Sequence, residues 1–283
     1  MPGRKFISGI FTRLAIERNP AVDFFQTKNG KAWLDNALDF AKRTSIASVR
    51  NLRNKPKYWF ILVDSTLCPE QKKLALDTFS TNTSIETRLI EVDGWSESSS
   101  AIENDNDAIK CNVQVRLDYD DLLHRDYFDM IYRAIAASKA PCLISPVKGI
   151  SHNTDPTQIA IIHKKLPPFS SLFRSTQTTQ LTIFSFDHDK WPHEMVVELA
   201  VKPLWIQTIS GKNISNTFGR GWLVSKVRHV RSLDLKTWTG EAAVLSSTEQ
   251  HLALKNFWEI SREKIGLLYD LFPLRNKNSE RLR

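Results

Sequence analysis

Long apolar runs and cysteines are both scarce in this sequence of 283 residues. No stretch of eighteen or more apolar side chains occurs, and a membrane-spanning helix needs about 20 such residues. The N-terminal apolar run is short and has no small-residue cleavage pattern, so we expect a cytoplasmic protein. The three cysteines are odd in number, lie in or beside apolar sequence and lack zinc-site spacing. These features argue against a disulfide scaffold or a zinc module.

Internal repeats, low-complexity tracts and the glycine patterns of nucleotide-binding P-loops are also missing. What remains is an ordinary globular composition with 41% hydrophobic and 25% charged residues, enough to bury a substantial core. The formal net charge of +8 favours an anionic partner: nucleic acid, nucleotide phosphates or an anionic membrane surface. Net charge alone does not choose among these three.

Short apolar runs rich in β-branched and aromatic residues alternate with helical patterns. We expect strands at residues 5–12, 57–64, 86–93, 112–118, 141–147, 157–163, 179–187 and 203–210. We expect helices at residues 32–52, 68–80 and 121–139, a capped amphipathic helix at 247–272, and loops at 93–107 and 170–179. This alternation predicts an α/β fold with a mostly parallel central sheet flanked by helices.

Three aspartates, Asp118, Asp120 and Asp121, crowd together where the strand at 112–118 ends. Ligands of open α/β sheets bind beyond the carboxyl ends of strands. Residues two apart in extended backbone face the same way, so Asp118 and Asp120 suit a hard divalent cation such as Mn²⁺ or Mg²⁺. Asp121 is then left to cap the following helix. The alternative is that all three aspartates only cap and charge that helix.

The run Arg-Leu-Asp-Tyr-Asp-Asp (116–121), the strand ending in Asp64 and the segment 203–216 resemble the putative rhamnosyltransferase family of bacterial glycosyltransferases. The resemblance spans roughly residues 11–221. It implies a GT-A-like, Rossmann-type fold in which Asp118 and Asp120 form the metal-binding DxD motif, with Arg116 balancing their charge. In that family the turn after the Trp-x-Gln strand often carries a histidine where this chain has Ser210, which leaves the metal's full ligand set open.

The resemblance also implies how the single domain is organised. We expect a nucleotide-sugar-binding part at about 1–146, an acceptor-side part at about 147–246 and a C-terminal helix at about 247–283. Residues at strand tips would line the nucleotide pocket, and polar residues of a glycine-containing loop would close over the sugar or pyrophosphate. These binding candidates are Thr12, Arg13, Asp64, Asn213 and Asn216.

Another Asp-x-Asp pattern, at 187–189, offers acid–base chemistry. A transfer that inverts configuration needs a base to take the proton of the acceptor hydroxyl. His188, Asp189 and Glu194 are the catalytic candidates. The simpler interpretation is a helix start, with Asp189 as cap and Glu194 favoured by the helix dipole.

Three function classes therefore compete. The first is a metal-dependent glycosyltransferase that moves a sugar, rhamnose among the candidates, from a nucleotide sugar to a surface-polysaccharide or lipid-linked glycan. The second is an Mg²⁺-dependent phosphohydrolase, although Leu122 stands where that chemistry prefers Thr or Val. The third, a basic nucleic-acid binder, rests on net charge alone. We favour the first, with no nucleic-acid partner. The basic C-terminal helix either rests on the inner membrane face or, as is more common for such helices, covers the protein's own core.

Overall fold

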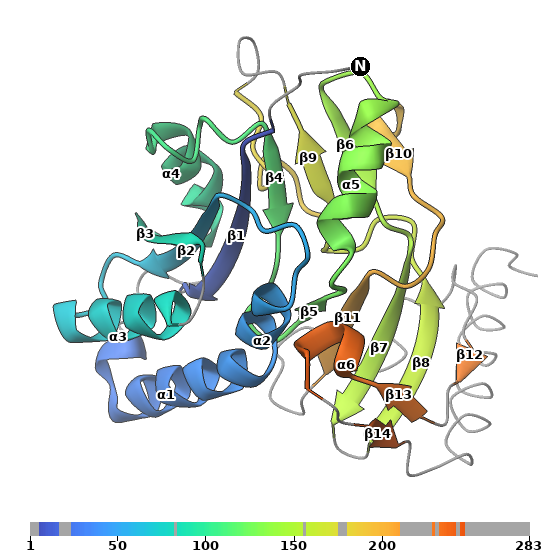
Figure 1. Ribbon diagram of the computed structural model, residues 1–283. Coiled ribbons are helices and arrows are strands. Elements are labelled where there is room, and N and C mark those ends of the chain that lie inside the picture. Colours follow the sequence, from blue (N-terminus) through green and yellow to red (C-terminus); the bar gives the residue numbers. More distant parts are fainter. Residues whose placement is uncertain are drawn as a thin grey trace, which may run out of the picture.

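The computed structural model describes residues 6–16, 24–81, 84–154, 157–174, 180–209, 228–229, 232–241 and 244–246. Its main feature is a seven-stranded sheet with the order β10-β6-β9-β4-β1-β2-β3 (Figure 1). Strand β9 runs antiparallel to both of its neighbours, and all other pairs in this sheet are parallel. The strands are β1 (Ser8–Ala15), β2 (Tyr58–Asp64), β3 (Glu86–Val92), β4 (Val113–Arg116), β6 (Cys142–Ser145), β9 (Ser171–Phe173) and β10 (Val196–Glu198). The predicted α/β fold with a mostly parallel sheet is confirmed.

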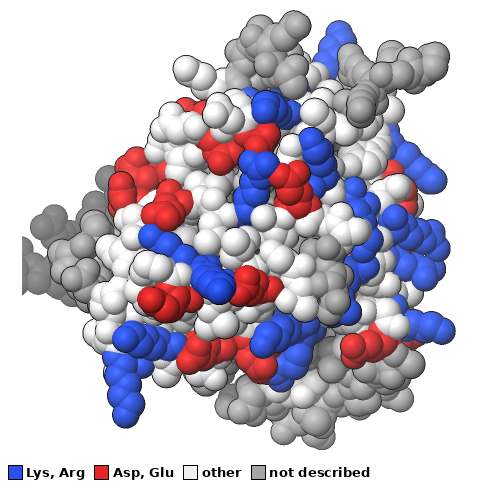
Figure 2. All heavy atoms as spheres, turned by 60° about the vertical axis from the view of Figure 1, so that its left-hand side comes forward, with Lys and Arg blue, Asp and Glu red and all other residues white. Residues whose placement is uncertain are grey.

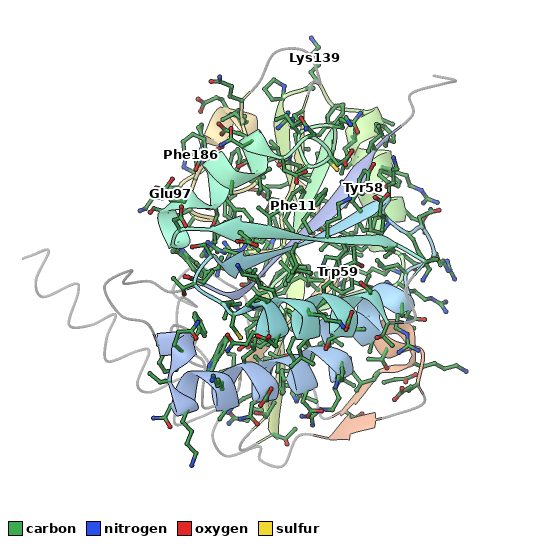
Figure 3. The ribbon with its side chains drawn as sticks, turned by 90° about the vertical axis from the view of Figure 1, so that its left-hand side faces the viewer. Phe11, Tyr58, Trp59, Glu97, Lys139 and Phe186 are labelled. Carbon is green, nitrogen blue, oxygen red and sulfur yellow. The ribbon has the colours of Figure 1, made fainter. Side chains whose placement is uncertain are left out.

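Both faces of this sheet are covered, which explains why β1 and β2 are buried along their whole length. Trp59 of β2 lies on one face, where its ring meets Phe79 of α3 edge-on at 5.0 Å. Phe11 of β1 lies on the other face, stacked on Phe60 at 4.9 Å, and Figure 3 shows Phe11 and Trp59 on opposite sides. The first face carries α1 (Lys28–Arg43), α3 (Pro69–Ser80) and α5 (Tyr127–Ala136); the second carries α4 (Ser98–Asn104) and the segment 181–191.

A second, five-stranded sheet has the order β12-β8-β7-β11-β5. Its strands are β5 (Leu122–Leu123), β7 (Lys148–Thr154), β8 (Thr157–His163), β11 (Trp205–Ile209) and β12 (Arg228–His229). Short helix α6 (Lys236–Thr239) packs Trp238 against this sheet, beside the hairpin of β13 (Ser232–Asp234) and β14 (Val244–Ser246). Because β4 belongs to the first sheet and β5 to the second, the aspartate run 118–121 crosses between the two sheets.

Two predicted helices differ from the structure. The helix expected at 32–52 is two helices, α1 and α2 (Ser45–Arg50), because Thr44 between them has non-helical backbone angles of φ −117° and ψ −96°. The helix expected at 121–139 begins only at Tyr127. Leu122 and Leu123 pair instead with β11 as strand β5, so a long-range strand pairing replaces the expected first helical turn.

The expected loops and one expected strand also need correction. Residues 93–107 contain the 3-10 helix η2 (Trp95–Glu97) and α4, since Ile102 supplies a fully buried apolar contact there. Strand β9 lies within the expected loop 170–179. The strand expected at 179–187 forms turns in its described part, residues 180–187. The predicted C-terminal helix at 247–272 lies outside the described residues.

Candidate active site

The carboxyl ends of the adjacent parallel strands β1 and β4 bring together the residues that carry most of the site's charge. Phe11 stands opposite Arg116 in the strand register, so Arg13, two residues further on, lies beside the position of Asp118. Arg116 holds Asp118 with two contacts, Nε to Oδ1 at 3.3 Å and Nη2 to Oδ2 at 3.1 Å. This forked pairing fixes both side chains on the face of the sheet that α4 covers.

The pairing keeps Asp118 ionised. Burial raises the pKa of this carboxyl, but the neighbouring guanidinium groups of Arg116 and Arg13 outweigh burial and hold the pKa below its ordinary value. The Asp118 side chain is still 27% exposed, so solvent or a ligand can reach it. Asp118 is therefore a charged, accessible oxygen donor at the end of β4.

Asp121 has a different role from the predicted helix cap. Its Oδ1 accepts the backbone N–H of Thr208 in β11 at 2.8 Å, and the residue is 2% exposed. The N-cap position of α5 belongs instead to Asp126, so the capping prediction for Asp121 is wrong. Burial, followed by the charges of Asp120 and Asp118, raises the pKa of Asp121 well above its ordinary value.

The segment 181–191 brings His188 to the same place. Burial lowers the pKa of His188 to about 4, with further lowering by Arg116 and Lys164, while Asp189 and Asp118 act in the opposite direction. An imidazole within electrostatic reach of Asp118 is neutral at pH 7 and can accept a proton. The structure thus unites His188 with the Asp118 cluster, although the two lie 70 positions apart in the chain.

Lys164, which directly follows β8, is a member of the cluster that the sequence did not reveal. Burial lowers the pKa of its ammonium, and Asp189, Arg116 and Asp121 all act on it electrostatically. The only sequence signal was a lysine at a strand end, which is common on protein surfaces. Its presence adds a third cation to Arg13 and Arg116.

The remaining catalytic candidates are more exposed. Asp189 is exposed and lies close enough to His188 and Lys164 to raise the pKa of each. Glu194 is exposed on the 3-10 helix η3 (His193–Met195). The charged groups that shift the pKa of His188 are Arg116, Lys164, Asp189 and Asp118, and Glu194 is not one of these four. The predicted helix start is thus a single 3-10 turn.

Two of the predicted nucleotide-binding residues make structural hydrogen bonds. Thr12 is fully buried, and its hydroxyl accepts the indole N–H of Trp59 at 2.9 Å. Asp64 accepts the backbone N–H of Thr66 at 3.0 Å and its hydroxyl at 2.7 Å, which closes the turn after β2. Both remain predictions as binding residues. Asn213, Asn216 and Ser210 lie outside the described residues.

No group of three or more His, Cys, Asp or Glu side chains in the described ranges is arranged to hold a metal ion by itself. Two carboxylates nevertheless suit Mg²⁺ or Mn²⁺, which usually keep waters and take further oxygens from substrate phosphates. The oxygen donors of Asp118 and Asp120 therefore fit such an ion when a diphosphate supplies the other ligands.

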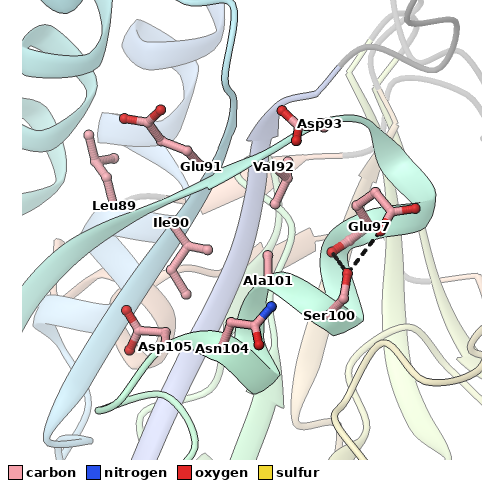
Figure 4. A pocket seen from close by; sticks show the side chains of 10 residues that line it. All are labelled: Leu89, Ile90, Glu91, Val92, Asp93, Glu97, Ser100, Ala101, Asn104 and Asp105. Atoms are coloured by element: carbon pink, nitrogen blue, oxygen red, sulfur yellow. Dashed lines mark hydrogen bonds between the residues drawn. The ribbon is translucent and has the colours of Figure 1, made fainter.

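A pocket of about 490 Å³ lies elsewhere, between β3 and α4 (Figure 4). Figure 4 shows Glu97 accepting hydrogen bonds from the Ser100 hydroxyl, at 3.0 Å to the backbone oxygen and 2.9 Å to Oε2. Its lining contains four carboxylates and no Lys or Arg, which makes it unfavourable for a diphosphate. The lining carboxylates are Glu91, Asp93, Glu97 and Asp105.

Comparison with protein families gives a direct result: the model of the family described as putative rhamnosyl transferase matches residues 45–221, more than half of the chain. The chain belongs to this family. The resemblance drawn from the aspartate run is thereby confirmed, and with it the prediction of a glycosyltransferase family. The comparison with curated proteins found no match.

The structure is also similar to solved structures at low identity. TarS 1–349 from S. aureus is 8% identical, with 71% of this chain and 60% of that chain covered at a TM-score of 0.42. A complex of TarS 1–349 with UDP-GlcNAc is also 8% identical; the match covers 71% of this chain and 58% of that chain at a TM-score of 0.43. A putative nucleotide-diphospho-sugar transferase from Desulfovibrio desulfuricans G20 is 10% identical; the match covers 71% of this chain and 82% of that chain at a TM-score of 0.33. The match spans less than two thirds of the TarS chains.

The distribution of surface charge and the apolar character of the helices also concern the partners of this protein. Figure 2 shows acidic and basic side chains interspersed over the left and centre of the face that it presents, with Lys and Arg gathered toward its right-hand side. Among the described residues, no helix has both the length and the apolar character needed to cross a bilayer.

Proposed function

We propose that this protein is a metal-dependent glycosyltransferase of the GT-A type. It takes a sugar from a nucleotide-sugar donor and transfers it to a surface-polysaccharide or lipid-linked glycan; rhamnose is the sugar that the family name suggests. The observation that carries this proposal is the meeting of Arg13, Arg116 and Asp118 at the carboxyl ends of β1 and β4. Ligands of open α/β sheets bind at such an edge.

The donor's diphosphate is the proposed ligand of the cations. Arginine presents planar, permanently charged N–H donors that suit phosphate oxygens, and Arg13 and Arg116 lie on the same side of the sheet. Asp64 would lie toward the nucleoside, and Asn213 and Asn216 would contact the sugar or pyrophosphate. These three assignments follow from the family resemblance. Thr12 would contribute only its backbone, because its buried side chain bonds to Trp59 on the opposite face of the sheet from Arg13.

Asp118 and Asp120 would hold Mn²⁺ or Mg²⁺ against the diphosphate. Such an ion, when bound, neutralises the charge that develops on the leaving diphosphate. The chain's own contribution is to keep Asp118 ionised through Arg116 and to anchor the end of the aspartate run through Asp121 and Thr208.

His188 is the proposed base for the acceptor hydroxyl if transfer inverts configuration, with Asp189 and Glu194 as the other candidates. His188 is supported by its position, since Asp118 and Arg116 both act on its pKa. We place the reaction in the cytoplasm, with peripheral contact to the inner membrane face where a lipid-linked acceptor would be presented.

A thermal-shift screen tests this function. Nucleoside diphosphates and nucleotide sugars, including UDP, GDP and dTDP and their sugar derivatives, are added with Mn²⁺ or with EDTA. One nucleotide family should raise the melting temperature in Mn²⁺ and lose most of the effect in EDTA, because ligands stabilise the state they bind. No shift with any nucleotide would contradict the proposal.

A further inference from the structure

The side chain of Arg13 contacts two aromatic rings that come from distant parts of the chain. Its guanidinium carbon is 3.4 Å from the centroid of Trp95 and 4.5 Å from the centroid of Phe184. Arg13 is 8% exposed, so these contacts are largely shielded from water, where a cation–π contact is stronger.

Phe184 also connects Arg13 with the DxD motif. The guanidinium carbon of Arg116 is 5.7 Å from the centroid of the same ring. Arg116 in turn pairs with Asp118. The order of contacts is therefore Trp95, Arg13, Phe184, Arg116 and Asp118, and we name these five residues the arginine stack.

The backbone at one end of the arginine stack is specialised to place Trp95. Gly94, which precedes it, has a φ of 123°, a conformation that residues with a side chain rarely adopt. Trp95 then begins η2 and leads into α4. A glycine-dependent turn thus directs this indole onto Arg13.

The segment that carries Phe184 is held firmly as well. The backbone N–H of Ile183 donates to Gln114 Oε1 of β4 at 2.9 Å. The hydroxyl of Ser185 accepts the N–H of Thr182 at 2.8 Å, and Ser99 of α4 bonds to the Thr182 hydroxyl at 2.8 Å. Phe184 therefore has a defined position, four residues before His188.

We propose that Trp95 and Phe184 are positioning residues, which clamp Arg13 so that its N–H groups face the donor's diphosphate beside Asp118. This inference rests on the proposed function. Two cations and one carboxylate at one strand edge could otherwise rearrange. The clamp fixes the place of Arg13 beside Asp118 and sets the donor site next to the segment that carries His188.

Calorimetric titration of UDP, GDP and dTDP in Mn²⁺ tests the clamp. Phe184→Leu and Trp95→Leu should each weaken binding of the preferred nucleotide by roughly 3- to 30-fold, the range expected from a cation–π contact. Phe184→Tyr, which keeps an aromatic face, should stay within about 2-fold of the unmodified protein. Phe186→Leu is the matched control, because Phe186 lies on the same segment but packs against Trp191. Unchanged affinity in Phe184→Leu, or an equal loss in Phe186→Leu, overturns the proposal.

A double-mutant cycle separates failure of the clamp from failure of the proposed function. Urea unfolding of Arg13→Met, Phe184→Leu and the double variant should show a coupling of roughly 2- to 30-fold in the unfolding equilibrium constant. If the unmodified protein binds none of the three nucleotides, the proposed function fails, and the coupling alone then decides whether the clamp exists. A coupling of 1 within error overturns the clamp in either case.

Discussion

The buried carboxyl of Asp121 allows one prediction to be worked out closely. Replacing Asp121 with Ala removes the acceptor of the Thr208 N–H and leaves a buried donor without a partner. Such a loss costs about 1–3 kcal/mol in the free energy of unfolding. For a protein of this size each kcal/mol shifts the melting temperature by about 2–4 °C, so the variant should melt roughly 2–12 °C below Asp121→Asn, which also lacks the charge but keeps an acceptor.

Asp121→Asn should behave differently, because the amide keeps an oxygen acceptor and removes a negative charge. The pKa of Asp121 is raised in the folded protein, so its proton stabilises the fold below the unfolded pKa of about 3.9 and this stabilisation is lost as pH rises through the folded pKa. In EDTA at pH 8, the Asp121→Asn variant should therefore have a melting temperature equal to or above that of the unmodified protein. This difference in melting temperature should shrink toward pH 4.

Scanning calorimetry of both variants from pH 4 to 8 is the assay, with Asp189→Asn as an exposed control. If Asp121→Asn melted as early as Asp121→Ala at pH 8, the reasoning about burial and like charge would be refuted.

Three further outcomes are expected. In a steady-state assay, His188→Ala should lower the rate of sugar transfer by about 10²- to 10⁴-fold and retain donor affinity, whereas Glu194→Ala should keep a nearly normal rate. The opposite pattern would identify Glu194 as the base. Burial lowers the pKa of His124, His152 and His188 to about 4, so their neutral forms stabilise the fold above the unfolded pKa of about 6.5. This stability is lost as pH falls from 6.5 toward 4; urea unfolding should give a lower free energy at pH 5 than at pH 7, and His152→Gln should reduce the difference. Binding of duplex DNA should be weak at physiological salt, and a tight, sequence-selective complex in a gel-shift assay would speak for a nucleic-acid partner.

Regular elements were predictable where one local signal dominated. Residues 58–63 are continuously apolar and lie in β2, and the segment at 68–80 has proline at its first helical position and became α3. The strand at 157–163 agrees with β8 at both ends. In each case the local pattern and the tertiary surroundings favour the same structure.

The start of α5 was not predictable from its local pattern. Residues 121–126 continue a helical spacing, yet Leu122 and Leu123 pair with β11, whose sequence lies more than 80 positions away. The hydrogen bond from Thr208 to Asp121 depends on the same pairing. Propensity contributes only tenths of a kcal/mol per residue, so such tertiary contacts prevail.

The candidate site was predictable in part. The aspartate run and Arg116 could be placed at a strand end because β4 has a clear alternating pattern. Lys164, Trp95 and Phe184 could not, since each reaches the cluster through sheet order and loop paths that no local spacing encodes. Arg13 was identified as a strand-tip cation, but its aromatic neighbours appear only in the fold.

Calorimetric titration of the preferred nucleoside diphosphate tests the central claim most directly. It is carried out on the unmodified protein and on the Asp118→Asn, Asp120→Asn double variant, each with Mn²⁺ and with EDTA. We predict binding to the unmodified protein in Mn²⁺ and loss of that binding in EDTA, because two carboxylates and a diphosphate need a shared cation. The double variant lacks the two carboxylates that would hold the ion and should bind the nucleotide under neither condition. Normal affinity of the double variant in EDTA would contradict a metal-dependent donor site at the end of β4.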